Sequence, residues 1–159
     1  MSEAPTGDIT GPRTGVQRKA GVLEKLQSRH ADAWVASAPE KGAAHLVPLS
    51  IAWHEDRVML VTPADSATAQ NIVTTRAARL ALGGTRDVVM IDARLDEAMV
   101  LAETSSELAD AYAQQADWDP RSSTGDFVVL LLRPHRIQAW READEIDGRT
   151  LMREGSWLV

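Results

Sequence analysis

The chain has 159 residues and a formal net charge of −6, with 44% hydrophobic residues, 25% charged residues and no cysteine. This composition is typical of one soluble globular domain, and the lack of cysteine excludes disulfides, iron–sulfur clusters, thiolate zinc sites and a cysteine nucleophile. An acidic chain lacks the basic surface of a general nucleic-acid binder, and no apolar run approaches the roughly 18 residues of a membrane-spanning helix.

Residues 1–14 are rich in Gly, Pro and Thr and show no periodicity, which predicts a flexible N-terminal arm before a domain over residues 15–159. The first residues also lack the basic-then-apolar pattern of a secretory signal, so we expect a cytoplasmic protein. Apolar residues then recur at helical spacing and predict an amphipathic helix over about 15–29; they are Val16, Ala20, Leu23 and Leu26.

Three short apolar segments, residues 33–38, 45–53 and 58–62, predict an antiparallel meander. Pro48 lies in the middle of the second segment, where it removes one ladder hydrogen bond. Its position indicates an edge strand, a bulge or a place where a ligand takes over the pairing. Trp34 and Trp53 lie on these segments and are expected in the core.

The segment from Val58 to Ile72 predicts a strand, a turn and a helix over about 66–76. A helix N-terminus offers unpaired N–H groups and a partial positive charge, which suit an anion such as a phosphate. Ser66 or Asp65 is predicted to cap the helix, and hydroxyls in this segment could bind phosphate oxygens. An ordinary helix cap without a ligand explains the same residues, and both interpretations stay open.

The rest of the chain predicts strands at 78–83, 87–101, 127–132 and 136–142, and a helix from the capping-box sequence Thr104-Ser-Ser-Glu107 to about 116. The length of the 87–101 segment indicates a bent or barrel-forming strand, and Pro134 is expected to separate the last two strands. Six or seven strands with three helices indicate a small β-barrel or an α+β protein. No Gly-x-Gly-x-x-Gly follows a strand, so a Rossmann site is unsupported.

Classical catalytic and metal motifs are missing from the sequence. Its four histidines show no metal-ligand spacing, so no metal site is predicted; they are His30, His45, His54 and His135. No Gly-x-Ser-x-Gly elbow occurs, and the catalytic residues stay unknown.

The order of several motifs nevertheless resembles the pyridoxamine 5′-phosphate oxidase-like split β-barrel superfamily, which comprises flavin- and deazaflavin-dependent oxidoreductases. The motifs are Trp34-Val-Ala-Ser, His45-Leu-Val-Pro-Leu-Ser50, Leu60-Val-Thr62, Ser66-x-Thr68-x-x-Asn71, Arg79-Leu-Ala-Leu-Gly and, as in actinobacterial members, Arg136-Ile-Gln-Ala-Trp140-Arg141. The resemblance covers about residues 16–158. It implies a mainly β (α+β) fold, a six-stranded antiparallel split β-barrel with Greek-key character and peripheral helices.

The resemblance also implies a homodimer with cofactor sites at its interface, and an oxidoreductase that transfers hydride to or from an unidentified small molecule. The cofactor is expected to be FMN, or alternatively the deazaflavin coenzyme F-420. Its phosphate would lie against Thr62, Ser66 and Thr68, with Asn71 nearby. The strand residues Val47, Pro48, Leu49 and Ser50 would run along the ring, and Trp140 of either subunit would lie near the ring or the substrate.

One departure from the resemblance bears on function. Flavin-binding relatives commonly carry Arg or Lys within the segment that here spans residues 66–71, and this chain has no cation there. Charge-assisted hydrogen bonds are roughly twice as strong as neutral ones, so we expect weaker phosphate binding unless Arg76, Arg79, Arg86 or a partner's cation compensates. A non-catalytic binding protein for a flavin, haem or other planar ligand, or a cofactor-free barrel dimer, therefore remains an alternative.

Overall fold

The computed structural model describes residues 11–159, so residues 1–10 of the predicted arm lie outside the described part of the chain. Its helices are α1 (Gly15–Gln27), α2 (Ala67–Thr75) and α3 (Ser106–Ala116), with short 3-10 turns η1 (Leu101–Glu103), η2 (Pro120–Ser122) and η3 (Ala143–Glu145). The strands are β1 (Asp32–Ser37), β2 (His45–Ser50), β3 (Ala52–His54), β4 (Arg57–Pro63), β5 (Ala77–Leu82), β6 (Val88–Val100), β7 (Phe127–Trp140), β8 (Thr150–Arg153) and β9 (Ser156–Trp157).

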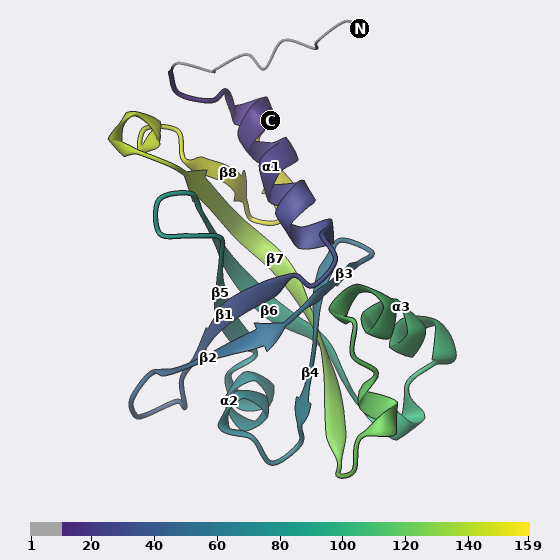
Figure 1. Cartoon of the computed structure of the whole chain (residues 1–159). Coiled ribbons are helices and arrows are strands. Elements are labelled where there is room, and N and C mark those ends of the chain that lie inside the picture. Colours follow the sequence, from purple (N-terminus) through teal and green to yellow (C-terminus); the bar gives the residue numbers. More distant parts are fainter. Residues whose placement is uncertain (1–10) are drawn as a thin grey trace, which may run out of the picture.

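These strands form one curved antiparallel sheet in the order β2-β1-β5-β6-β7-β4-β3, and the β8–β9 hairpin is attached to β7 (Figure 1). The described residues thus form nine strands rather than the six expected, because three short strands, β3, β8 and β9, are added to six longer ones. A mostly antiparallel sheet with three peripheral α-helices agrees with the expected split-barrel α+β class.

The predicted meander is wrong, because the second predicted segment is divided between two parts of the sheet. Residues up to Ser50 pair with β1 at one end of the sheet order, whereas Ala52–His54 pair with β4 at the other end. The backbone N–H of Ile51 between them donates to the carbonyl of Ala31 at 2.9 Å. The chain therefore changes its pairing partner at Ile51, and β2 lies at an edge of the sheet.

The predicted break at Pro134 is also wrong, because β7 runs through it as one strand. The ladder between β6 and β7 pairs Asp92 with Arg136 and Ala93 with Pro134, which leaves His135 as an extra residue. A proline is tolerated at such a β-bulge, and a bulge also bends the strand and redirects a side chain. A second irregularity in the same ladder lies between Leu95 and Glu97, so the long β6 strand is bent as predicted.

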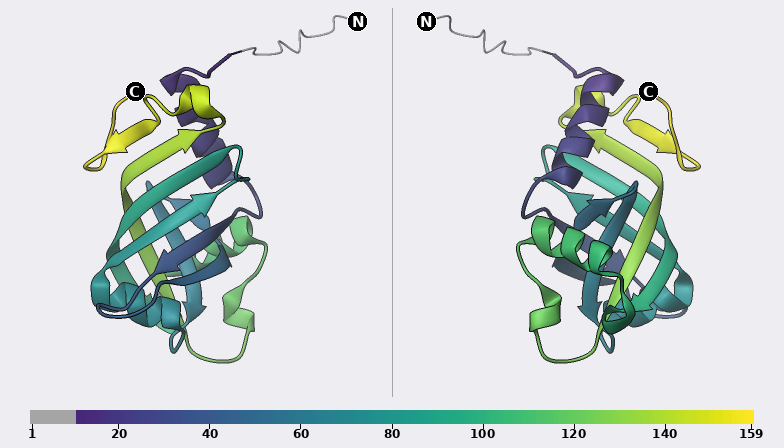
Figure 2. Two further views of the ribbon diagram at one scale, coloured as in Figure 1. Left: turned by 90° about the vertical axis from the view of Figure 1, so that its left-hand side faces the viewer. Right: turned by 90° about the vertical axis from the view of Figure 1, so that its right-hand side faces the viewer.

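The main core fills the concave side of the sheet and is closed at one end by Val22 and Leu26 of α1 (Figure 2). A second cluster lies under α3, where Tyr112 is buried and its hydroxyl donates to the Ser50 carbonyl at 3.2 Å. Burial raises the pKa of Tyr112 to about 12. Trp53 packs against the main core as expected, but Trp34 is 52% exposed, so its predicted core position is wrong.

A network of charged groups ties the start of α1 to the loop after β7. The guanidinium of Arg13 binds the Glu145 carboxylate through Nε at 3.0 Å and Nη2 at 2.8 Å, and Arg141 donates its backbone N–H to the same carboxylate at 2.8 Å. Asp87 lies within 3.5 Å of cations from three segments, among them Arg13 and Lys25. These contacts hold the α1 end of the barrel together.

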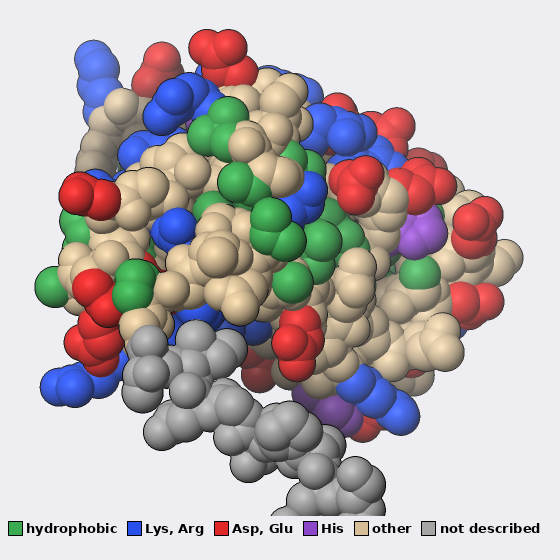
Figure 3. All heavy atoms as spheres, turned by 90° about the horizontal axis from the view of Figure 1, so that it is seen from above, with side chains coloured by type: hydrophobic (Ala, Val, Ile, Leu, Met, Phe, Trp, Pro, Cys, Tyr) green, Lys and Arg blue, Asp and Glu red, His purple; other side chains and the backbone are tan. Residues whose placement is uncertain are grey.

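On the face seen from above, Lys and Arg side chains alternate with Asp and Glu and with hydrophobic side chains, so no charge of one sign dominates it (Figure 3). None of the helices among residues 11–159 combines the length and the apolar character that crossing a membrane requires.

Both predicted helix caps can be compared with the structure. Ser66 caps α2 as predicted, since its hydroxyl accepts the backbone N–H of Ala69 at 3.1 Å. The predicted capping box of α3 is wrong: Ser105, not Thr104, is the cap, and the Thr104 hydroxyl donates to the Val100 carbonyl at 3.0 Å.

Replacing Ser66 with alanine removes the acceptor for the Ala69 N–H and is expected to lower the free energy of unfolding by about 1 kcal/mol. Urea denaturation followed by circular dichroism measures this change. Thr74→Ala, an exposed position in the same helix, serves as the control and should leave stability almost unchanged. Equal effects from the two variants would contradict the role of the Ser66 cap.

Candidate functional site

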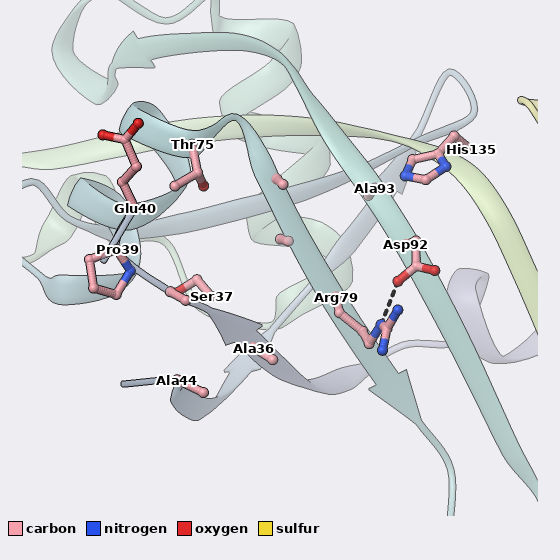
Figure 4. Close-up of a pocket in the computed structure, with 13 residues that line it drawn as sticks. Ala36, Ser37, Pro39, Glu40, Ala44, Thr75, Arg79, Asp92, Ala93 and His135 are labelled. Carbon is pink, nitrogen blue, oxygen red and sulfur yellow. Dashed lines mark hydrogen bonds and ion pairs between the residues drawn. The ribbon is translucent and has the colours of Figure 1, made fainter. Parts of the chain in front are cut away.

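An open groove of about 660 Å³ lies on the convex face of the sheet, between the β1–β2 turn and strands β5 and β6. Small side chains form most of it, and polar groups lie at its sides; the lining includes Ala36, Ser37, Ala44, Thr75, Ala77, Arg79, Asp92 and His135. In Figure 4, Glu40 and Pro39 lie at one side of the groove, and Arg79, Asp92 and His135 lie at the other.

The charges in this groove are largely paired with one another. Arg79 donates to Asp92 at 2.5 Å, and this bond holds the pKa of the Arg79 guanidinium above its ordinary value. Arg136 approaches the other oxygen of Asp92 at 3.8 Å. Arg79 was one of the residues expected to replace the missing phosphate-binding cations, and in the structure its charge is already balanced by a carboxylate.

A second cavity of about 340 Å³ adjoins the groove and shares Thr75, Ala77 and His135 with it. Its other lining residues are Arg76, Arg94 and Leu95. His135 is the extra residue of the β7 bulge, and it lines both cavities because the bulge turns its side chain away from the regular alternation of the strand.

The groove borders an apolar row that runs across four strands on the same face. In the strand register Pro48 lies opposite Trp34, Trp34 opposite Ala81, and Ala81 opposite Met90. Residues opposite one another across strands lie on one face of the sheet. Leu46 lies two residues before Pro48 and is 59% exposed, so this face of β1 and β2 is apolar and uncovered.

The predicted phosphate-binding residues lie together at the start of α2. The hydroxyls of Thr62 and Ser66 are 3.2 Å apart, and the Asn71 side-chain amide donates to the Ser37 hydroxyl at 3.3 Å. Thr62 and Thr68 are buried, with exposed fractions of 3% and 1%. These hydroxyls are therefore bonded to protein groups or enclosed, whereas Ser37 connects the cluster to the groove through Asn71.

The other predicted cofactor residues lie elsewhere. The strand from Val47 to Ser50 belongs to β2, and its position at the sheet edge explains how the ladder accepts Pro48. Trp140 ends β7 at the opposite end of the barrel from α2 (Figure 1), where Arg149 lies over its ring at 5.8 Å. None of the nine predicted residues lines the groove itself, although α2 and β2, which carry most of them, contact each other.

One trio of side chains could hold a metal ion. The ligating atoms of His54, Glu55 and Glu107 lie within 4.8 Å of one another at the β3–β4 turn and the start of α3. Glu55 also contacts the guanidinium of Arg57 at 3.4 Å, which opposes a metal cation there. This trio shares no residue with the groove and was not predicted.

No protein-family model and no curated protein sequence matches the chain. Similar solved structures include an F-420 reductase (TM-score 0.58, 13% identity, 72% of this chain and 94% of that one). A candidate pyridoxamine 5′-phosphate oxidase from Listeria innocua matches with a TM-score of 0.60 at 12% identity over 78% of this chain and 98% of that one. The haem storage protein HutZ from Vibrio cholerae matches with a TM-score of 0.59 at 14% identity over 76% and 93%.

At these identities the likeness is one of fold. The expected split-barrel architecture is therefore confirmed, since solved structures with this fold cover most of the chain. One fold carries many functions, so the ligand of this chain has to be argued from its own residues.

Proposed function

We propose that this protein is a homodimeric oxidoreductase of the split-barrel type that binds FMN or the deazaflavin coenzyme F-420 and transfers hydride to or from a small molecule. The observation that carries the proposal is the open groove beside the uncovered apolar row of β1 and β2. Similar solved structures include proteins named as an F-420 reductase and as a candidate pyridoxamine phosphate oxidase, which favours a flavin-type ligand.

The open edge of β2 is the proposed place for the ring of such a cofactor. As an edge strand, β2 carries backbone N–H and C=O groups without a strand partner, and these can bond the polar edge of a planar ring. The residues proposed for this role are Pro48, through its carbonyl, and Ser50, through its N–H, whereas Val47 and Leu49 share the parity of Ile51 and turn their backbone groups toward β1. When bound, the flavin or deazaflavin supplies the hydride chemistry, and the chain orients it and excludes water.

A second copy of this chain is the proposed cover for the apolar row. Trp34 and Leu46 are more than half exposed; β1 otherwise buries every second residue, whereas β2 has no fully buried residue. Contiguous exposed apolar side chains are typical of protein–protein contacts, and aromatic residues supply much of the binding energy in them. Because the groove lies on the same face, a dimer formed here would also enclose the groove and could bring Trp140 of one copy toward the other.

The start of α2 should bind a phosphate more weakly than a site that carries cations. The predicted hydroxyls of Thr62 and Ser66 are bonded to each other, Thr68 is enclosed, and no cation lies in this turn. We retain Thr62, Ser66, Thr68 and Asn71 as a proposed phosphate site without a cation. The alternative location for the phosphate is the cavity beside His135, which is lined by two arginines.

A second candidate function is the binding of haem or another planar ligand without turnover. It is favoured by His135, a half-buried imidazole in a groove otherwise formed largely by small side chains. A neutral imidazole is a common ligand of haem iron. The similar proteins that are named as haem-binding add support for this candidate.

The test is the absorbance spectrum of the purified full chain, followed by fluorescence titration with FMN and with F-420. Binding at micromolar concentration or tighter, with turnover of the reduced cofactor, is expected for the oxidoreductase. A Soret band in the purified protein would favour the haem candidate instead. A colourless protein that binds none of the three would contradict both candidates.

The location of the phosphate can be tested with Ala67→Glu. Ala67 is exposed in the first turn of α2, where a carboxylate favours the helix but repels a phosphate. If the phosphate binds there, the variant should weaken FMN at least tenfold and leave riboflavin unchanged. Gln70→Glu, exposed one turn later, is the matched control, and equal FMN affinity in all three proteins would exclude the α2 N-terminus.

A further inference from the structure

Five arginines lie close together on or beside strands β5, β6 and β7, in a chain whose net charge is −6. Three of them have carboxylate partners: Arg79 and Arg136 contact Asp92, and Arg133 contacts Asp96 at 3.0 Å. Within residues 11–159 the other two, Arg76 and Arg94, make no salt bridge, and both line the cavity of about 340 Å³ beside His135.

The fold positions these two guanidinium groups, which lack a carboxylate partner among the described residues. Arg76 follows α2 directly and is joined to Leu95 of β6 twice: its carbonyl accepts the Leu95 N–H at 2.9 Å, and its Nη2 donates to the Leu95 carbonyl at 2.7 Å. Arg94 lies in β6 next to Leu95, opposite Ala77 of β5. The register of these strands therefore brings both side chains to one cavity.

The remaining groups in this cavity also suit an anion. His135 contributes an imidazole, and no carboxylate from the described residues lines the cavity, whereas the Thr75 hydroxyl already donates to the Asn71 carbonyl at 2.8 Å. In the adjoining groove Asp92 is already bound by Arg79 and Arg136. Guanidinium groups form strong charge-assisted hydrogen bonds with the oxygens of phosphate and carboxylate.

We propose that Arg76 and Arg94, with His135, form an anion subsite for the phosphate or carboxylate of a ligand whose body lies in the adjoining groove. The identification of that body as a flavin rests on the proposed function, whereas the anion subsite itself does not. The subsite places the ligand's negative charge at the C-terminal end of α2, not at its N-terminal end.

The direct test is a titration of the ¹⁵N-labelled full chain with inorganic phosphate, and separately with acetate, followed by amide and arginine side-chain resonances. Saturable shifts at Ala77, Leu95 and His135 are expected, stronger for whichever anion the site prefers. Arg94→Gln should weaken this binding about tenfold or more, because it removes a charge-assisted hydrogen bond. Arg133→Gln, on the next strand but paired with Asp96, is the matched control and should bind as the unchanged protein does.

A comparison of FMN with riboflavin separates this proposal from the proposed function. FMN should bind at least tenfold more tightly than riboflavin, and Arg94→Gln should remove that preference without changing riboflavin. If phosphate shifts the cavity resonances but neither flavin binds, the subsite stands and the flavin assignment fails. If neither anion shifts these resonances, or if Arg133→Gln weakens binding as much as Arg94→Gln, the subsite is overturned, whatever the flavins do.

Discussion

Replacing Leu46 with glutamate is expected to convert the proposed dimer into monomers. Leu46 is 59% exposed on β2, beside Trp34 and Pro48, on the face proposed to meet a second copy. The substitution would enclose one carboxylate from each copy in an apolar contact, and a desolvated unpaired charge costs several kcal/mol. The dissociation constant of the dimer should therefore rise roughly a hundredfold or more.

Sedimentation velocity over a range of concentrations measures this change. Val16→Glu is the matched control, because Val16 is 68% exposed on α1, away from the proposed face. The control should remain a dimer, and both variants should fold, since neither position is buried. Dissociation by both variants, or a monomer for the unchanged protein, would contradict the dimer. Loss of cofactor affinity in Leu46→Glu alone would further support a site that the second copy completes.

Replacing Glu145 with glutamine is expected to lower the free energy of unfolding by about 3 kcal/mol. Glu145 is 3% exposed, and its carboxylate accepts hydrogen bonds from the Arg13 side chain and from the Arg13 and Arg141 backbone. The glutamine keeps the shape but leaves the Arg13 guanidinium against a neutral amide. Asp144→Asn, the exposed neighbouring position, should change stability by less than about 0.5 kcal/mol.

The same carboxylate predicts a pH dependence of stability. Hydrogen bonds from Arg13 hold the pKa of Glu145 at about 2, below its usual value of 4.5. A depressed folded-state pKa stabilises the protein above the unfolded pKa, and this contribution is lost as the pH falls from about 4.5 toward 2. Urea denaturation between pH 7 and 2 should show this decline in the unchanged protein. Glu145→Gln should lack that part of the decline, and parallel curves for the two proteins would contradict the assignment.

Local patterns predicted most elements because the signals that define them are local. The helix capped by Ser66 and the alternation along β6 were predicted correctly from spacing alone. Pairing partners depend on the whole sheet, so the change of partner at Ile51 and the continuity of β7 through Pro134 could not be derived from their own segments. The short strands β8 and β9 carried too few residues for a periodic signal.

The site was less predictable than the fold for the same reason. The sequence suggested Arg76, Arg79 and Arg86 as replacement cations, and of these Arg76 lines the cavity beside His135. Arg94 and His135 gave no such signal, since they reach one cavity only through the register of β6 and the bulge in β7. Trp34 was expected in the core because it is an aromatic on a strand, and only the strand register shows that it lies on the outer face.

The extra residue in β7 also changes which residue numbers along this strand face the core. Before the bulge the main core is filled by even-numbered residues, Leu130 and Leu132, and after it by odd-numbered residues, Ile137 and Ala139. The bulge at His135 thus changes the core-facing residues of β7 from even to odd numbers. A deletion there would place Pro134 and Arg136 next to each other opposite Ala93 and Asp92, so the ladder would continue in regular alternation with Ile137 and Ala139 still in the core. The imidazole that lines the groove therefore stands on an insertion that the core does not need, and it serves the outer face of the barrel.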